Sequence, residues 1–362
     1  MTSLKGTRVF ITLFVLTAFT LHVNAIAGSP DTSAAVSLHD GCMKSDAARG
    51  AVDEESFVTI GGIEQWITIH GDDCTNPVVL FLHGGPGNTL TPFADAIYGG
   101  WEKDFTLVQW DQRAAGKTWG RNPPPEEFML TIEQMRDDGL AVARYIAKRL
   151  GKTKVILLGG SWGSILGVHM IHAEPELFEA WVGVSQVVNK LENQAASYAS
   201  VLARARDAKD EVTVAALEGI GAPPWKNPRN PGVLRRASRI YEAKVSTPAP
   251  TSWWKPSQQY ATERAEADYE AGEDFSYIQF VGLSDDGMFA SVDLAELGLA
   301  FDVPVYLIQG AEDLVTVPDV TKKYFDRIEA PAKKYVLVPA AGHDPNEAVI
   351  KAQFEVLKEL AR

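Results

Sequence analysis

Short apolar runs recur along the chain, and their pattern predicts two kinds of β-strand. Residues 57–60 and 65–69 alternate between apolar and polar side chains, and the glycine pair between them predicts a hairpin at a sheet edge. The later runs are almost continuously apolar, which is typical of strands buried on both faces. They span residues 77–82, 105–110, 154–158, 180–184, 303–308 and 334–338.

Helical periodicity appears between these strands. Thr131 and Gln134 form a capping-box pattern, and apolar residues then recur at helical spacing as far as Leu150, where Gly151 ends the helix. The end of the chain shows the same periodicity. Strands that alternate with helices predict the α/β fold class, with a mainly parallel sheet covered by helices on both faces.

Residues 189–300 interrupt this alternation. The block is charged, helix-like and rich in Trp and Tyr, and it contains no long run of the buried-strand type. It predicts a helical lid inserted into a single α/β domain, whose two parts are residues 56–188 and 301–362. The polar residues 26–55, with little periodicity, precede that domain.

The first 25 residues have the pattern of a secretory signal peptide. Lys5 and Arg8 precede the apolar residues 9–21, and Val23-Asn24-Ala25 then places small residues at the cleavage positions. The sequence therefore predicts export, to a periplasm or out of the cell. An uncleaved N-terminal anchor is the alternative, whereas the lack of a cysteine near the cleavage point argues against a lipid anchor.

The charge balance excludes some partners. Hydrophobic residues make up 46% of the chain and charged residues 22%, as in ordinary soluble proteins. Removal of the signal peptide takes away two basic residues, which leaves 32 basic against 47 acidic residues and a net charge of −15. Such a surface repels nucleic acids and anionic membranes, so we expect neither a nucleic-acid partner nor stable membrane association after cleavage.

Two cysteines, Cys42 and Cys74, occur in the chain. In an exported protein this pair predicts a single disulfide bridge, and two unpaired thiols are the alternative.

The segment Gly159-Gly160-Ser161-Trp162-Gly163 carries the strongest chemical signal. It follows a strand-like run and opens a helix-like one, which is the layout of a nucleophile elbow. Glycines fit beside the serine because the turn is tight, and the turn lifts the hydroxyl clear of the sheet. An ordinary strand-to-helix turn is the alternative interpretation of Ser161.

A serine nucleophile needs a base, and the base needs an orienting acid. His343 and Asp313 follow the last two predicted strands, and the order Ser161, Asp313, His343 is that of α/β-hydrolases. We predict that Ser161 attacks a carbonyl, His343 moves the proton and Asp313 orients the imidazole. Glu312 and Asp344 are the rival acids.

The developing oxyanion needs two backbone donors. The N–H of Trp162, directly after the nucleophile, is the first candidate. The second candidate is Gly85, in the glycine-rich loop of residues 83–87 that follows a predicted strand. Alternatively, these glycines serve only to make a turn. His83 itself reads as structural.

Other motifs carry less weight. Gly116-Lys117-Thr118 resembles the end of a phosphate-binding loop, but Asp111 stands where that pattern needs its first glycine. The chain contains no metalloprotease helix motif and no zinc-binding cysteine pair. Aromatic residues of the predicted lid could line a substrate pocket or simply pack. They are Trp225, Trp253, Trp254, Tyr260 and Tyr269.

Together these motifs resemble the α/β-hydrolase family and, within it, the proline iminopeptidase (prolyl aminopeptidase) group of serine peptidases. The motifs are His83-Gly-Gly-Pro-Gly87, Asp111-Gln-Arg113, Gly159-Gly-Ser-Trp-Gly-Ser164, Gly310-Ala-Glu-Asp313 and Gly342-His343. The resemblance covers residues 57–187 and 301–362. It implies an α/β-hydrolase fold with a lid, release of an N-terminal residue, typically proline, from peptides, and no cofactor.

The chain also departs from that group. Its members bind the free amino group through lid glutamates, one of them in a Trp-Glu context, whereas Lys255 follows Trp254 here. Ala114 replaces the glycine that usually ends the Asp-Gln-Arg-Gly motif. A serine at position 161 argues against haloalkane dehalogenases and epoxide hydrolases, which use aspartate. The lid carboxylates Glu192, Glu242, Glu263 and Glu270 are candidates among which no motif selects.

The sequence thus predicts a serine hydrolase that forms an acyl-enzyme, most simply an aminopeptidase acting on short peptides. A carboxylesterase or amidase with the same triad is the alternative, and a non-catalytic binding protein on a hydrolase fold is a more distant one. The expected partner is a small peptide or ester substrate.

Overall fold

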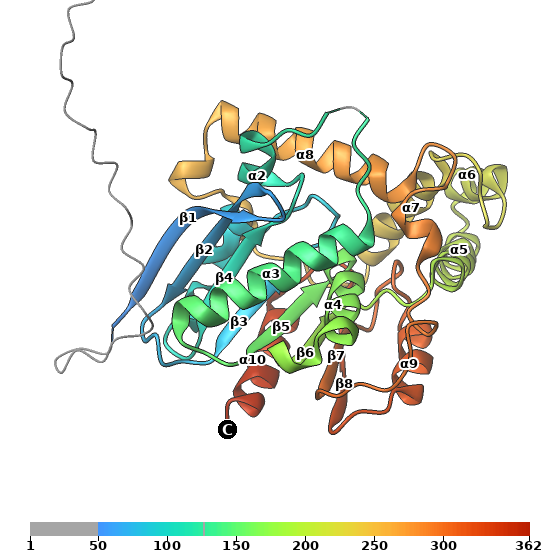
Figure 1. Cartoon of the computed structure of the whole chain (residues 1–362). Coiled ribbons are helices and arrows are strands. Elements are labelled where there is room, and N and C mark those ends of the chain that lie inside the picture. The colour runs from blue at the N-terminus through green and yellow to red at the C-terminus, as the bar shows by residue number, and fades with distance from the viewer. Residues whose placement is uncertain (1–49, 126) are drawn as a thin grey trace, which may run out of the picture. The chain divides into compact units, whose positions relative to one another are not determined.

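The structure of the protein is a computed structural model that describes residues 50–125 and 127–362 (Figure 1). The described residues all belong to one compact unit. The predicted signal peptide, residues 1–25, and Cys42 lie outside them. Within the described ranges, no helix combines the length and the apolar character needed to cross a membrane.

In this part of the chain, eight strands form one sheet in the order β1-β2-β4-β3-β5-β6-β7-β8. The strands are β1 (Val52–Ile60), β2 (Ile63–Gly71), β3 (Val78–Leu82), β4 (Thr106–Asp111), β5 (Val155–Gly160), β6 (Phe178–Val184), β7 (Val305–Gly310) and β8 (Lys333–Val338). β2 is antiparallel to β1 and β4, and the remaining pairs are parallel. The predicted α/β fold with a mainly parallel sheet is confirmed.

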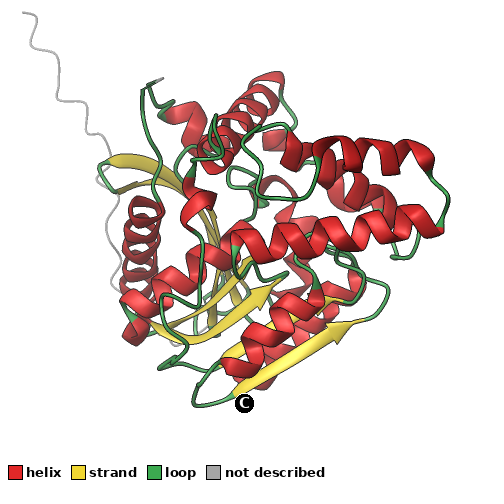
Figure 2. Cartoon of the chain, turned by 90° about the vertical axis from the view of Figure 1, so that its right-hand side faces the viewer, coloured by secondary structure: helices red, strands yellow, loops and turns green. Residues whose placement is uncertain are grey.

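Helices cover both faces of the sheet (Figure 2). Strand β3 illustrates this two-sided packing, because successive side chains of a strand point to opposite faces of the sheet. Val78, Leu80 and Leu82 pack into the apolar core beneath α3, α4 and α9, while Val79 and Phe81 pack beneath α1 and α10. These helices are α1 (Ala94–Tyr98), α3 (Ile132–Leu150), α4 (Trp162–Ala173), α9 (Pro318–Arg327) and α10 (Glu347–Leu360).

The ends of α3 follow the sequence pattern. The hydroxyl of Thr131 accepts a hydrogen bond from the backbone N–H of Gln134 at 3.1 Å. Gly151 ends the helix with a φ of 64°, in the left-handed region that glycine adopts without a steric penalty. Both helix boundaries are therefore determined by local chemistry.

The first strand begins earlier than the sequence predicts. β1 starts at Val52, inside the segment 26–55 that was expected to precede the sheet. Its charged residues hid the strand pattern, yet they have partners on neighbouring elements: Asp53 lies 3.0 Å from His70 of β2, and Glu54 contacts Arg149 of α3. An edge strand tolerates such residues because one of its sides faces water.

Residues 189–300 lie between β6 and β7 and contain no strand of the sheet. Their helices are α5 (Lys190–Asp207), α6 (Glu211–Ile220), α7 (Asn230–Glu242) and α8 (Glu263–Val281). Figure 1 shows α5, α6 and α7 gathered together, while α8 lies along α2 (Gly116–Arg121). The first three helices share a small apolar core, which includes Leu217, Trp225 and Tyr241. We refer to residues 189–300 as the lid.

Candidate active site

Ser161 stands in a strained turn between β5 and α4. Its backbone has φ 54° and ψ −116°, a region that residues with a side chain rarely adopt. A side chain at Gly159 would overlap the carbonyl of Gly163, and one at Gly163 would overlap the carbonyl of Leu82. The glycines on both sides of the serine are thus required by the close approach of α4 to the ends of β3 and β5.

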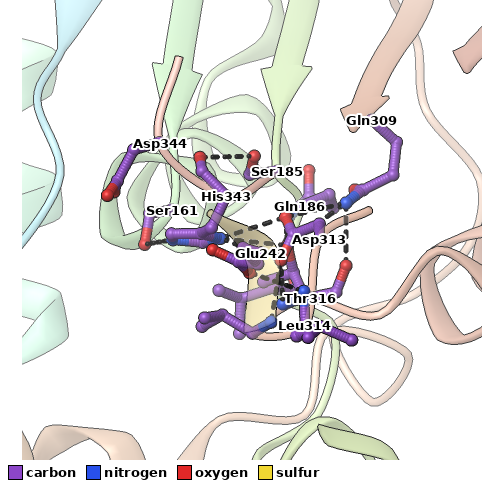
Figure 3. A network of polar contacts seen from close by, with 12 residues as sticks. Ser161, Ser185, Gln186, Glu242, Gln309, Asp313, Leu314, Thr316, His343 and Asp344 are labelled. Carbon is purple, nitrogen blue, oxygen red and sulfur yellow. Dashed lines mark hydrogen bonds and ion pairs between the residues drawn. The ribbon is translucent and has the colours of Figure 1, made fainter. Parts of the chain in front are cut away.

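Three predicted residues come together at the carboxyl edge of the sheet (Figure 3). The Oγ atom of Ser161 lies 3.0 Å from Nε2 of His343. The Nδ1 atom of His343 lies 3.0 Å from Oδ2 and 3.2 Å from Oδ1 of Asp313. These residues follow β5, β8 and β7, and both the imidazole and the carboxylate are buried.

Asp313 is held by more than the imidazole. Its Oδ1 atom accepts the N–H groups of Val315 and Thr316, each at 2.8 Å. Its Oδ2 atom accepts the hydroxyl of Thr316 at 2.6 Å and the amide of Gln309 at 2.9 Å. Burial raises the pKa of Asp313, but the charge of His343 and the hydrogen bonds outweigh burial and keep this pKa below its ordinary value. The group is therefore a carboxylate at neutral pH.

The two rival acids point to the lid instead. Glu312 forms an ion pair with Arg204 at 3.1 Å. Asp344 is more than half exposed and lies 3.2 Å from Arg235. Asp313 is the carboxylate that contacts the imidazole.

The glycine-rich loop lies beside the elbow because Leu82 of β3 pairs with Gly159 of β5. A Cβ atom placed on Gly84 would be 3.6 Å from the Cβ of Ser161. Gly85 has a φ of 107°, which a residue with a side chain would adopt only under strain. Trp162 is the first residue of α4, where a backbone N–H has no acceptor within the helix. The assignment of Gly85 and Trp162 as oxyanion donors stays a prediction.

His83 links this loop to the next strand. Its Nδ1 lies 2.9 Å from the carbonyl of Gly84, and its Nε2 accepts the N–H of Gln112 at 3.2 Å. Burial lowers the pKa of His83 to about 4, so the ring is neutral. The side chain of Gln112 in turn accepts the indole N–H of Trp162 at 2.9 Å. The sequence analysis included Gln112 in the Asp111-Gln-Arg113 motif but gave it no role, because its contacts with His83 and Trp162 are visible only in the folded structure.

The segment that resembles a phosphate loop has a structural explanation. Asp111, buried at the end of β4, accepts the N–H of Lys117 at 2.8 Å and the hydroxyls of Thr89 and Thr91, each at 2.5 Å. The ammonium of Lys117 lies 3.9 Å from the ring centre of Trp66. These contacts hold α2 against the end of β4, and the ammonium of Lys117 lies over the aromatic ring of Trp66.

The predicted lid aromatics divide into two groups. Trp225 and Tyr260 are buried and hydrogen-bonded, with the Trp225 indole donating to the Gly221 carbonyl at 2.8 Å. Trp254 is exposed, and the hydroxyl of Tyr269 donates to the side chain of Asn88 at 2.8 Å, next to the glycine-rich loop. Trp253 is buried. Tyr269 thus contacts the residue that directly follows the glycine-rich loop of residues 83–87.

Of the lid carboxylates named from the sequence, Glu242 is the one buried beside the triad. Its Oε1 accepts the N–H of Leu314 at 2.6 Å. Burial raises its pKa, and the nearby charge of Asp313 adds to this effect. Glu192, Glu263 and Glu270 are exposed.

The predictions on metal binding and on the disulfide also concern the described part of the chain. No group of three or more His, Cys, Asp or Glu side chains in the described ranges is placed to hold a metal ion. Cys74 is buried, and its N–H donates to the carbonyl of Gly50 at 3.0 Å. Because Cys42 lies outside the described residues, the bridge stays a prediction.

The chain is similar to known proteins in sequence and in fold. The family model described as "alpha/beta hydrolase fold" matches residues 77–347. A relative named "Probable aminopeptidase YbaC" from Bacillus subtilis is 28% identical over 299 residues, which cover 80% of this chain and 90% of the relative. A "Probable proline iminopeptidase" from Streptomyces coelicolor is 24% identical over 318 residues, 81% of this chain and 92% of the relative.

Solved structures show the same fold. The crystal structure of a proline iminopeptidase from Mycobacterium smegmatis superposes with a TM-score of 0.62 at 19% sequence identity, and the match covers 85% of this chain and 99% of that one. The sheet, the elbow and the family match lead to one conclusion. This chain belongs to the α/β-hydrolase family, as a hydrolase that resembles the proline iminopeptidases.

Proposed function

We propose that the protein is a serine hydrolase with the triad Ser161, His343 and Asp313, acting through an acyl-enzyme. One observation carries the proposal: the line of contacts from the Ser161 hydroxyl through both ring nitrogens of His343 to the buried carboxylate of Asp313. The distance is 3.0 Å at both steps, within the reach that proton transfer needs.

Each residue then has a defined role. His343 takes the proton of Ser161 as the hydroxyl attacks the substrate carbonyl, and it returns that proton to the leaving group. Asp313 accepts the Nδ1–H of the imidazole, fixes the tautomer with a free Nε2 and stabilises the imidazolium. The N–H groups of Gly85 and Trp162 would bind the oxyanion. Water then attacks the acyl-enzyme, with His343 again serving as the base.

For the substrate, we propose a short peptide with a free N-terminus, so that the reaction releases an N-terminal residue such as proline. The names of the two relatives above support this choice. The interrupted Trp-Glu match at Lys255 favours a second candidate, an esterase or amidase with the same triad.

A panel of substrates separates these possibilities. We would compare Pro- and Ala-p-nitroanilides with acetyl-Pro-p-nitroanilide and with short p-nitrophenyl esters. Faster cleavage of the free-amine anilides supports the aminopeptidase, whereas equal cleavage of the acetylated anilide contradicts recognition of a free amine. Ser161→Ala should abolish turnover of every substrate while leaving the melting temperature nearly unchanged. Turnover retained by this variant would refute the mechanism.

We also propose that the protein is exported and carries the Cys42–Cys74 bridge. N-terminal sequencing of protein from the native host should find a mature end near residue 26, and thiol titration without reductant should find no free thiol. An intact Met1 end would contradict cleavage, and two free thiols would contradict the bridge.

A further inference from the structure

We propose that helix α7 of the lid is a positioning element for catalysis, in which Glu242 holds the loop of the acid against the loop of the base. The proposal rests on the triad proposed above. It assigns Glu242 to the alignment of the catalytic residues and not to contact with the substrate.

The first contact is with the residue directly after the acid. The N–H of Leu314 donates to Oε1 of Glu242 at 2.6 Å. The carbonyl of Leu314 accepts the hydroxyl of Ser238, also on α7, at 3.4 Å, and the hydroxyl of Ser197 on α5. Both backbone groups of Leu314 are therefore bonded to lid side chains.

The side chain of Leu314 belongs to the lid as well. It is 2% exposed and packs in the apolar core that α5, α6 and α7 share, among residues such as Leu234 and Tyr241. Leu314 is covalently part of the loop that follows β7, yet its surroundings are those of a lid residue. A displacement of α7 would consequently move Leu314.

Movement of Leu314 would reach the acid through the next two residues. The carboxylate of Asp313 accepts the N–H groups of Val315 and Thr316, both at 2.8 Å. Leu314 lies between the carboxylate and these donors in the chain. The orientation of Asp313 against His343 thus depends on a turn whose second residue is held by the lid.

The second contact of Glu242 is with the loop of the base. A Cβ atom placed on Gly342 would lie 3.2 Å from Oε2 and 3.3 Å from Cβ of Glu242, so this side chain packs against the backbone directly before His343. Figure 3 shows Glu242 beside Asp313, Leu314 and His343. Glu242 is 5% exposed, and one buried side chain therefore touches both catalytic loops.

The same face of α7 contacts the base loop again. Arg235 and Arg239 lie 3.2 Å and 3.8 Å from the carboxylate of Asp344, the residue after His343. Positions 235, 238, 239 and 242 follow the three- and four-residue spacing that places side chains on one side of a helix. The two arginine contacts are exposed and weak, so Glu242 is the residue to test.

The test compares Glu242→Leu and Glu242→Gln with the wild type. Leucine removes the acceptor for Leu314, whereas glutamine keeps an acceptor oxygen of the same reach. For each protein we would measure kcat and KM with a free-amine anilide and with a p-nitrophenyl ester, and the rate at which a fluorophosphonate labels Ser161. Labelling reports the reactivity of the serine without a bound peptide.

We expect Glu242→Leu to lower kcat on both substrates, and the labelling rate, by about 10- to 100-fold, because small displacements of catalytic groups have effects of this size. KM should stay within about threefold, since no substrate contact is lost. Glu242→Gln should recover most of the loss. Asp210→Ala is the matched control: it removes the cap of α6 and the partner of Tyr241, which weakens the lid without touching either catalytic loop. It should lower the melting temperature and leave kcat unchanged.

Three results would overturn the proposal. If a fluorophosphonate labels Ser161 in Glu242→Leu at the wild-type rate, the reactivity of the serine does not depend on this contact. A rise in KM for the free-amine substrate alone would make Glu242 a binding residue. Equal losses of kcat in Glu242→Leu and Asp210→Ala would show that the loss comes from a less stable lid and not from the contacts of Glu242. A failure of the triad proposal can be distinguished from these results, because the wild type and Ser161→Ala would then give the same values in every assay.

Discussion

Replacement of Asp313 by asparagine tests the proposed mechanism with a change of one atom. In the wild type, Oδ1 accepts hydrogen bonds from two backbone N–H groups, and Oδ2 accepts hydrogen bonds from the hydroxyl of Thr316, the amide of Gln309 and the imidazole. An amide nitrogen in the Oδ1 position would face the N–H groups of Val315 and Thr316, which cannot move without distorting the turn. The amide nitrogen should therefore take the Oδ2 position, where the hydroxyl of Thr316 can rotate to accept and the side-chain amide of Gln309 can turn its oxygen toward the new donor.

That orientation places an N–H donor 3.0 Å from Nδ1 of His343. The imidazole must then accept at Nδ1 and carry its proton on Nε2, where it can no longer take the proton of Ser161. An acid replaced in this way in a Ser-His-Asp triad lowers kcat by about 10⁴-fold, which corresponds to about 5 kcal/mol of activation free energy. We expect a loss of this order for Asp313→Asn.

The assay is steady-state hydrolysis of the best anilide, with the melting temperature measured in parallel. Glu312→Gln and Asp344→Asn are the controls, because these exposed or partly exposed carboxylates pair with lid arginines and should leave kcat within about threefold. A kcat for Asp313→Asn within tenfold of the wild type, in a folded protein, would refute the tautomer argument. A large loss in either control would show that the acid has been misassigned.

Two further predictions concern stability. Gly163→Ala should lower the free energy of unfolding by at least about 1–3 kcal/mol in urea titrations, because its methyl group would overlap the carbonyl of Leu82; an unchanged midpoint would contradict the tight elbow. The second prediction concerns pH: the charge of His343 and the hydrogen bonds around Asp313 outweigh burial and lower its pKa in the folded state. The Asp313 carboxylate therefore stabilises the folded protein at a pH above the unfolded pKa. This contribution is lost as the pH falls through the folded pKa. The difference in unfolding free energy between wild type and Asp313→Asn should therefore be constant above about pH 5 and shrink below it; a difference that grows on acidification would reverse the sign.

The sheet and its helices were largely predictable because local chemistry determines them. Val78 to Leu82 reads as a strand since every side chain is apolar, and the cap at Thr131 and the glycine at 151 delimit α3 without reference to the rest of the fold. The start of β1 was not predictable in this way. Its charges at Asp53 and Glu54 are compensated by partners on other elements, His70 and Arg149, which no local pattern contains.

The same distinction applies to the candidate site. Ser161, Asp313 and His343 could be proposed from the sequence because each lies shortly after a predicted strand, and parallel strands bring their carboxyl ends to one edge. Gln112 also follows a strand, β4, and the sequence analysis named it as part of a motif without giving it a role. Its function as a bridge depends on the indole of Trp162, however, and only the packed structure supplies that partner.

The polar face of α7 illustrates the limit of sequence patterns most clearly. Arg235, Ser238 and Glu242 at helical spacing would be interpreted as a solvent-facing stripe, because buried helix faces are normally apolar. In the folded protein Ser238 is fully buried and Glu242 nearly so, and both are bonded to the backbone of Leu314. A buried polar group costs free energy unless it is hydrogen-bonded, so a polar helix face can be buried only where it finds hydrogen-bond partners. Here that partner is the loop that carries the proposed catalytic acid, which connects the position of the lid to the chemistry at Ser161.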